Sequence, residues 1–168
     1  MSQAILDILQ SARKPKEKTE ILTQALGRKK ISAKEFMVFF KTARDQDQGS
    51  CADVMKHLSA EHPELLGPFI PDLIPCVTSR VNRVKWGVPE ALGNLAEKYP
   101  EQVAKAIPNL LINAQDPSTV VRWCAAYALA ALLRHHPKAR KTLEGKIKGI
   151  IIREKNNGVR KVYEKALK

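Results

Sequence analysis

The chain has 168 residues, which is the length of one domain or of a short array of repeats. Lysine and arginine exceed aspartate and glutamate by 12, a charge that suits an anionic partner, while 44% hydrophobic and 27% charged residues indicate a folded rather than a disordered chain. Apolar runs such as 36–40 are too short to span a bilayer, so we expect no membrane partner, and the start Met-Ser-Gln does not resemble a secretory signal.

The spacing of apolar residues predicts helices throughout the chain and no strand. In the first 46 residues, helices are expected near 2–12, 16–28 and 33–45, with breaks at 14–15 and 28–31. Further helices are expected at 49–61, 64–79, 82–98, 101–115, 119–135 and 138–155, followed by a lone C-terminal helix. Pro68, Pro71 and Pro75 should bend or shorten the helix at 64–79, and Pro89 should kink the helix at 82–98.

An internal repeat of about 37 residues organises these helices. Prolines recur at this spacing, and so do aromatic, basic and small apolar residues. A period of this length indicates an array of stacked helix pairs. The corresponding positions are Pro63, Pro100 and Pro137; Pro71 and Pro108; Trp86 and Trp123; Lys85 and Arg122; Ala91-Leu92 and Ala128-Leu129. The C-terminal segment fits after one inserted residue, which places Arg160 on Arg122.

Residues 116–132 resemble the second-helix signature of the HEAT-repeat family, through Asp116-Pro-Ser-Thr-Val-Val-Arg122 and the alanines and leucines that follow. The resemblance is good over 101–136, fair over 64–99 and partial over 138–168. It implies an all-α, right-handed α-α superhelix of helix pairs, formed by one domain over 1–168, with atypical cap helices at 1–46 and recognisable repeats at 47–168. It also implies a protein-binding scaffold, although a subset of the family, the alkylpurine DNA glycosylases, holds DNA.

Positive charge is concentrated at the C-terminal end. Residues 1–84 carry a net charge of +3, residues 85–133 carry none, and residues 134–168 carry +9. This segment is either a patch that binds phosphates or a solvated surface that keeps the terminal repeat from self-association. If it binds nucleic acid, the candidate residues are Arg134, Lys138, Lys141, Lys148, Lys155 and Lys161.

Lys85, Arg122 and Arg160 occupy one repeat position, and an acid lies six residues before two of them, at Asp116 and Glu154. In HEAT-like proteins such acids and bases tend to form a ladder between repeats, and we expect that role here. Ser79 takes the place of the acid before Lys85. The sequence therefore predicts that the ladder is broken there and that Lys85 is free to meet a ligand.

Trp86 and Trp123 are repeat-equivalent and lie away from the apolar stripe of their helices. If the second helices line the concave side, the tryptophans form a strip there with Glu90, Tyr127, Lys85 and Arg122. Tryptophan, tyrosine and arginine are enriched at interaction hot spots, and aromatic rings also stack on bases. The alternative is that both indole rings are packed between adjacent helices.

A catalytic role has one weak basis, the layout of Trp86, Glu90 and Arg122, which resembles that of the HEAT-like DNA glycosylases. Glutamate stands where that subset has aspartate, and the chain is shorter. No motif for a metal, a cofactor or a nucleophile is present, and His57, His62, His135 and His136 are expected to face solvent at helix ends. Three scattered cysteines, Cys51, Cys76 and Cys124, favour a reducing compartment, so the expected location is cytoplasmic.

These observations predict a non-catalytic HEAT-repeat scaffold that binds a protein through its second-helix, concave face. The alternative is a nucleic-acid-binding protein that uses the basic C-terminal repeat together with the tryptophan strip. The lone C-terminal helix has an apolar side that could contact a second chain or pack back on the helix at 138–155.

Overall fold

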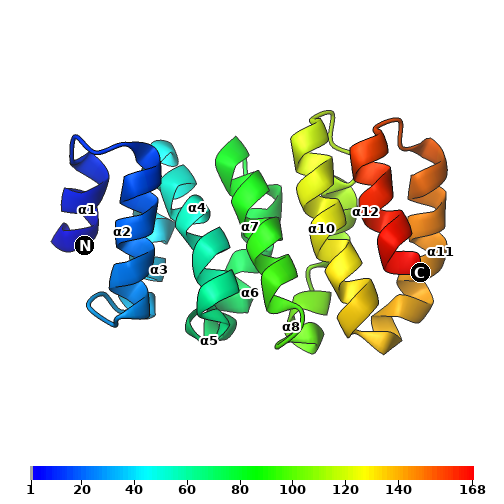
Figure 1. Cartoon of the computed structure of the whole chain (residues 1–168), viewed down its shortest axis with the longest axis horizontal. Coiled ribbons are helices and arrows are strands. Elements are labelled where there is room, and N and C mark those ends of the chain that lie inside the picture. The colour runs from blue at the N-terminus through cyan, green and yellow to red at the C-terminus, as the bar shows by residue number, and fades with distance from the viewer. Residues whose placement is uncertain (1) are drawn as a thin grey trace.

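The computed structural model describes residues 2–168, which form helices and connecting turns without a strand (Figure 1). Their helices are α1 (Gln3–Gln10), α2 (Pro15–Gly27), α3 (Ala33–Thr42), α4 (Asp45–Glu61), α5 (Pro63–Leu66), α6 (Ile70–Leu73), α7 (Asn82–Leu95), α8 (Pro100–Ala104), α9 (Ile107–Asn113), α10 (Thr119–His135), α11 (Pro137–Arg153) and α12 (Asn157–Leu167), with 3₁₀ segments η1 (Gly67–Phe69) and η2 (Ile74–Thr78). None of these helices is long and apolar enough to cross a bilayer.

The second helices of the repeats form a continuous row, α2, α4, α7, α10 and α12, which faces the viewer in Figure 1. Neighbours in this row make the closest helix packing in the molecule, above all α4 with α7 and α7 with α10. The first residues of α4, α7 and α10 are Asp45, Asn82 and Thr119, so these helices begin at intervals of 37 residues, and α12 begins 38 residues later. The predicted period, with its single insertion, is therefore the period of the structure.

Small residues allow these helices to approach closely. A Cβ atom placed on Gly87 of α7 would lie 2.6 Å from the carbonyl oxygen of Ala52 in α4. A Cβ atom on Gly93 would lie 2.6 Å from a ring carbon of Tyr127 in α10. Buried side chains form one connected core from Ile5 to Ala166, which links the N-terminal helices to the last repeat.

The first helices of two repeats are more fragmented than the sequence analysis predicted. Residues 64–79 form two short α-helices and two 3₁₀ segments, in accordance with the expected effect of their prolines. The expectation of one unbroken helix over 101–115 is wrong, because α8 ends at Ala104 and α9 begins at Ile107. Pro108 explains the break, since it has no amide hydrogen and its ring clashes with the carbonyl group four residues earlier. Pro89, in contrast, lies inside the continuous helix α7.

One junction residue precedes the proline that opens each first helix. His62, Tyr99 and His136 lie 37 residues apart and share a similar backbone conformation, with φ between −138° and −128° and ψ between 52° and 87°. The prediction that His136 faces solvent is wrong, because its side chain is buried. Its Nδ1 atom accepts a hydrogen bond from the Ala139 amide at 3.0 Å, which caps α11, and its Nε2 atom lies 3.2 Å from a carboxylate oxygen of Glu101.

The C-terminal helix α12 is not a lone helix, since it completes a pair with α11 and packs mainly on α10. Its apolar residues Val159, Tyr163 and Ala166 are buried. Arg140 of α11 donates hydrogen bonds to the carbonyl oxygens of Ala166 and Leu167 at the end of α12. This arginine therefore satisfies carbonyl groups that have no partner within their own helix.

Candidate protein-binding face

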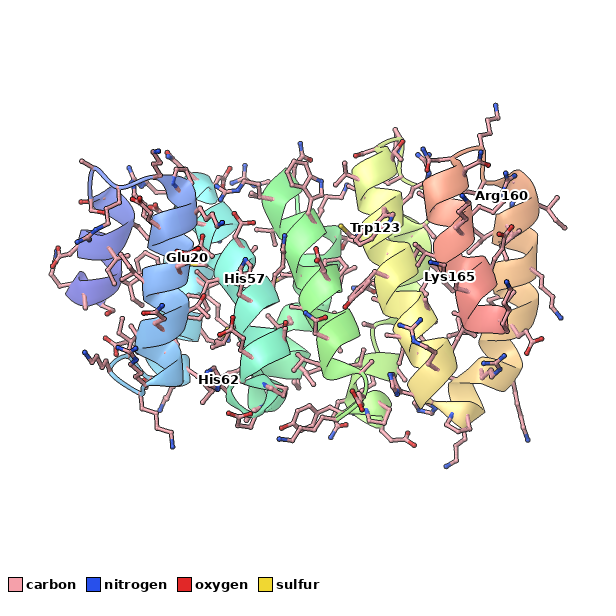
Figure 2. The ribbon with its side chains drawn as sticks, viewed as in Figure 1. Glu20, His57, His62, Trp123, Arg160 and Lys165 are labelled. Atoms are coloured by element: carbon pink, nitrogen blue, oxygen red, sulfur yellow. The ribbon has the colours of Figure 1, made fainter. Side chains whose placement is uncertain are left out.

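The row of second helices exposes a stacked aromatic pair, Trp123 and Tyr127, one turn apart on α10. The ring centroids are 5.7 Å apart and the ring planes differ by 19°. Trp123 is 37% exposed and lies on the face turned to the viewer in Figure 2, the same face as Lys165 of α12. The Tyr127 hydroxyl donates a hydrogen bond to the side-chain oxygen of Asn94 on α7. Tyr127 is thereby fixed from both sides, and it supports the exposed indole ring.

Asn94 ties the aromatic pair to two other helices. Its side-chain amide donates hydrogen bonds to the Lys56 carbonyl oxygen at 3.1 Å and to the Ser59 hydroxyl at 3.0 Å, both on α4. A chain of contacts therefore runs from α4 through α7 to the ring of Tyr127. The repeat equivalent of Asn94 is Ala131, so the periodicity of the sequence gives no signal at this position.

Trp86 differs from its repeat equivalent in exposure. Trp86 is only partly exposed, and its indole nitrogen is buried without a hydrogen-bond partner among residues 2–168. The alternative in which the ring is packed between helices therefore describes Trp86, and the exposed strip describes Trp123. Equal positions in the repeat therefore do not give equal exposure or the same neighbour, since the residue one turn on is Glu90 in α7 and the stacking partner Tyr127 in α10.

Glu90 lies on the same face and is paired across the helix boundary. A carboxylate oxygen is 3.6 Å from the ammonium group of Lys56 on α4. Burial, and after it the charge of Glu90, raises the pKa of Tyr127. The Tyr127 hydroxyl therefore keeps its proton at neutral pH and remains a donor to Asn94.

The predicted ladder of acids and bases joins successive repeats. The ammonium group of Lys85 pairs with Asp116 of the next repeat, and the guanidinium group of Arg122 pairs with Glu154 of the repeat after it, at 2.9 Å. Lys85 is therefore not free to meet a ligand, and that expectation was wrong. The base of one repeat pairs with the acid that follows it, so Ser79, which precedes Lys85, does not interrupt this rung.

The acid position has a second role in the loop that precedes each second helix. The side chains of Ser79, Asp116 and Glu154 accept hydrogen bonds from the backbone amide two residues later, at 2.8 to 3.1 Å. Ser79 retains this role and only lacks the charge. Burial raises the pKa of Asp116 and of Glu154, but hydrogen bonds from Lys85 and Arg122 outweigh it and hold both pKa values below their usual range.

The candidate nucleic-acid-binding residues do not converge on one cavity. Arg134 ends α10, Lys138, Lys141 and Lys148 lie along α11, Lys155 lies in the loop after it, and Lys161 lies on α12. All are exposed, and Lys148 is paired with Glu144 at 3.0 Å. Nucleic-acid binding by this set stays a prediction.

The three residues of the suggested glycosylase layout also do not meet in one cavity. Glu90 faces Lys56 on α4, while Arg122 pairs with Glu154. A cavity of about 350 Å³ beside Arg122 is lined by neither Trp86 nor Glu90. Over residues 2–168, no group of three or more histidine, cysteine, aspartate or glutamate side chains is arranged to hold a metal ion.

A separate cavity of about 320 Å³ opens on this face between α2 and α4. Its lining includes Glu20 and His57, which lie side by side on neighbouring helices in Figure 2. Asp53 and Lys56 also line it, and both already pair with residues of α7, namely Arg83 and Glu90. The charges in the central part of this face thus compensate one another, and the exposed aromatic ring on the face is that of Trp123 on α10.

Comparisons with known proteins agree with this architecture. The family model of the HEAT repeat matches residues 106–136, and no curated protein matches the sequence. An engineered protein from a structural genomics programme has a TM-score of 0.71 and 17% identity, over 99% of this chain and 78% of that one. A designed armadillo repeat protein, solved in complex with the peptide (KR)4, has a TM-score of 0.75 and 15% identity, over 97% and 79%. With its 37-residue helix pairs and its row of second helices, the chain has an α-α superhelical repeat fold like that of HEAT and armadillo repeat proteins.

Proposed function

We propose that this chain is a non-catalytic scaffold that binds a protein partner through the face formed by its second helices, with Trp123 and Tyr127 at the centre of the contact. The observation that carries the proposal is the exposed indole of Trp123, stacked on a tyrosine that Asn94 holds in place. Large aromatic side chains with little remaining freedom lose little entropy on binding, and they are the residues that most often dominate protein interfaces.

The fold supports this use of the face. The designed armadillo neighbour is solved with a peptide, (KR)4, and it shares the backbone arrangement of this chain. The central repeats of this chain, residues 85–133, carry no net charge, and the cations of their ladder are already paired with acids. Affinity at this part of the face should therefore come from aromatic and apolar contacts and should depend little on salt.

The experiment compares three variants in affinity capture followed by calorimetry with the purified partner. Trp123→Ala should weaken binding by about thirtyfold, the loss expected for a hot spot of about 2 kcal/mol. Tyr127→Phe retains the ring but removes the bond to Asn94, and a smaller loss is expected. Val38→Ala on α3 is the matched control, because it truncates a 52% exposed apolar side chain on a different layer and should leave binding unchanged.

Two outcomes would contradict the proposal. Equal affinities for the wild type, Trp123→Ala and Val38→Ala would remove the aromatic pair from the interface. Binding to duplex or single-stranded DNA that falls steeply with salt would favour the nucleic-acid alternative. In that case, neutralising Lys141, Lys148 or Lys155 should weaken binding about equally for all sequences.

A further inference from the structure

A groove runs along the side of α11 that faces α9, in the layer of first helices. One cavity of about 250 Å³ is lined by both helices, and the cavity of about 350 Å³ near Arg122 continues it toward the loops that precede α10 and α12. The two cavities share the residues Gln115, Ile150 and Arg153. We call this continuous depression the α9–α11 groove.

The groove exists because the first-helix layer is not closed at this point. α9 packs against η2 of the preceding repeat, whereas α11 packs on α10 and α12 and not closely on α9. Gly145 and Gly149 line the α11 wall, and a Cβ atom built on either would meet no atom within 4 Å. The wall therefore has no side chain at these two positions and leaves open space in front of the helix.

Free positive charge surrounds the α9–α11 groove. Lys146, Arg153 and Lys155 line it, are exposed, and form no ion pair with any residue from Ser2 to Lys168. The two carboxylates of the lining, Asp116 and Glu154, are already neutralised by their ladder partners. The uncompensated charge is therefore positive, which favours an anionic occupant.

The same groove has an apolar character that a phosphate backbone would not use. Leu111 and Ile150 form part of its lining. Ile112 and Ile152 do not line the cavities themselves, but they are 62% and 84% exposed, and each is three residues along the chain from a lining residue, Gln115 and Gly149 respectively. An apolar lining and exposed isoleucines close to it along the chain, together with free cations, match a ligand that combines carboxylates with aliphatic side chains.

We infer that the α9–α11 groove binds an acidic peptide segment that carries apolar side chains, from a partner protein that contacts this layer. The carboxylates of the segment pair with Lys146, Arg153 and Lys155, and its apolar side chains cover Leu111, Ile150 and the two exposed isoleucines. The segment approaches closely at Gly145 and Gly149. This site is on the first-helix layer and is independent of Trp123, so it does not depend on the function proposed above.

The test measures the fluorescence anisotropy of a labelled 16-residue peptide in which leucines recur every three or four residues, as on one face of a helix, with glutamates between them. The wild-type chain should bind it saturably. The double variant Lys146→Glu, Arg153→Glu should bind at least about tenfold more weakly. The matched control, Lys161→Glu, Lys165→Glu on α12, makes the same change in net charge outside the groove and should retain binding within about threefold.

A steric variant separates shape from charge. In Gly149→Leu the added Cβ atom would meet no atom within 4 Å and the side chain would extend into the open space, so thermal unfolding should remain cooperative while peptide affinity falls by about tenfold or more. The inference is overturned if the α12 control loses as much affinity as the groove variant, or if Gly149→Leu binds normally. It is also overturned if a peptide without leucines, or single-stranded DNA of equal charge, binds as tightly as the probe.

Discussion

The ion pair between Arg122 and Glu154 joins the last two repeats, and its energy can be measured directly. The guanidinium group donates two hydrogen bonds to the carboxylate, at 2.9 and 3.2 Å, and the side chains are 19% and 3% exposed. Charge-assisted bonds with this burial contribute more than exposed pairs do. We expect Glu154→Gln to lower the free energy of unfolding by about 2 kcal/mol, which for a chain of this length lowers Tm by about 4 to 8 °C.

A double-mutant cycle isolates the pair from the other contacts of its members. Arg122 also donates to the carbonyl oxygens of Asp116 and Pro117, so Arg122→Met should cost about 3 kcal/mol. The double variant should cost about as much as Arg122→Met alone, which corresponds to a coupling energy of about 2 kcal/mol. The exposed pair of Lys148 and Glu144 on α11 is the control, and its coupling should be much weaker than that of Arg122 and Glu154, because solvent screens it.

The pH dependence of this coupling gives a second check. The pKa of Glu154 is lower in the folded chain than its usual value, so its contribution to stability is fully present above the unfolded pKa of about 4.3. The contribution is lost as pH falls through the lower, folded pKa. Urea unfolding followed by circular dichroism at pH 7 and pH 3 measures this change. A coupling below about 0.5 kcal/mol at pH 7, or one that is unchanged at pH 3, would refute the reasoning.

Three further predictions concern packing, capping and thiol chemistry. Gly87→Ala should destabilise the chain by about 2 kcal/mol, because its Cβ atom would press on the Ala52 carbonyl group. Gly145→Ala adds a Cβ atom that meets no other atom, so it should stabilise the chain by about 0.5 to 1 kcal/mol. Urea unfolding compares the two variants, and equal effects would argue against the close approach of α4 and α7. His136→Ala should cost about 1 kcal/mol through loss of the α11 cap, while His135→Ala should cost less than about 0.5 kcal/mol; a smaller loss for His136 would show that its cap adds little stability. Burial raises the pKa of Cys51 and of Cys124 to about 12, so a thiol reagent added to the native chain at pH 8 should modify the half-buried Cys76 first. Mass spectrometry follows the modification of each cysteine, and rapid labelling of Cys51 would contradict its burial.

Much of the architecture could be predicted because it depends on local chemistry that recurs at a fixed interval. In the last three repeats, the second helix begins after a short loop with a polar side chain at the same position, and three first helices, α5, α8 and α11, begin at a proline. Ser79, Asp116 and Glu154 make the same backbone contact in three loops, and Pro63, Pro100 and Pro137 open three helices. These interactions span a few residues, so the sequence pattern alone indicates them.

The candidate site was predicted only in part, because exposure and pairing depend on which helices meet. Trp86 and Trp123 are equivalent in the sequence, yet Trp86 is partly buried with its indole nitrogen covered, whereas Trp123 is exposed and stacked on Tyr127. The partner of Lys85 is Asp116, which lies 31 residues along the chain in the next repeat. Ser79, in the loop that precedes Lys85, takes no part in that pair. The repeat equivalent of Asn94 is Ala131, so no periodic signal could identify the asparagine.

The sequence by itself thus determined the helical class, the 37-residue period, the starts of α2, α7 and α10 to within one residue, and the presence of a ladder of charges. Tertiary structure decided which base meets which acid, which tryptophan remains on the surface, and where the first-helix layer stays open beside α11. The physical reason is the range of the interactions. Helix formation and capping act within a turn or two of the chain, whereas burial and ion pairing across repeats depend on the stacking of helices that lie more than 30 residues apart.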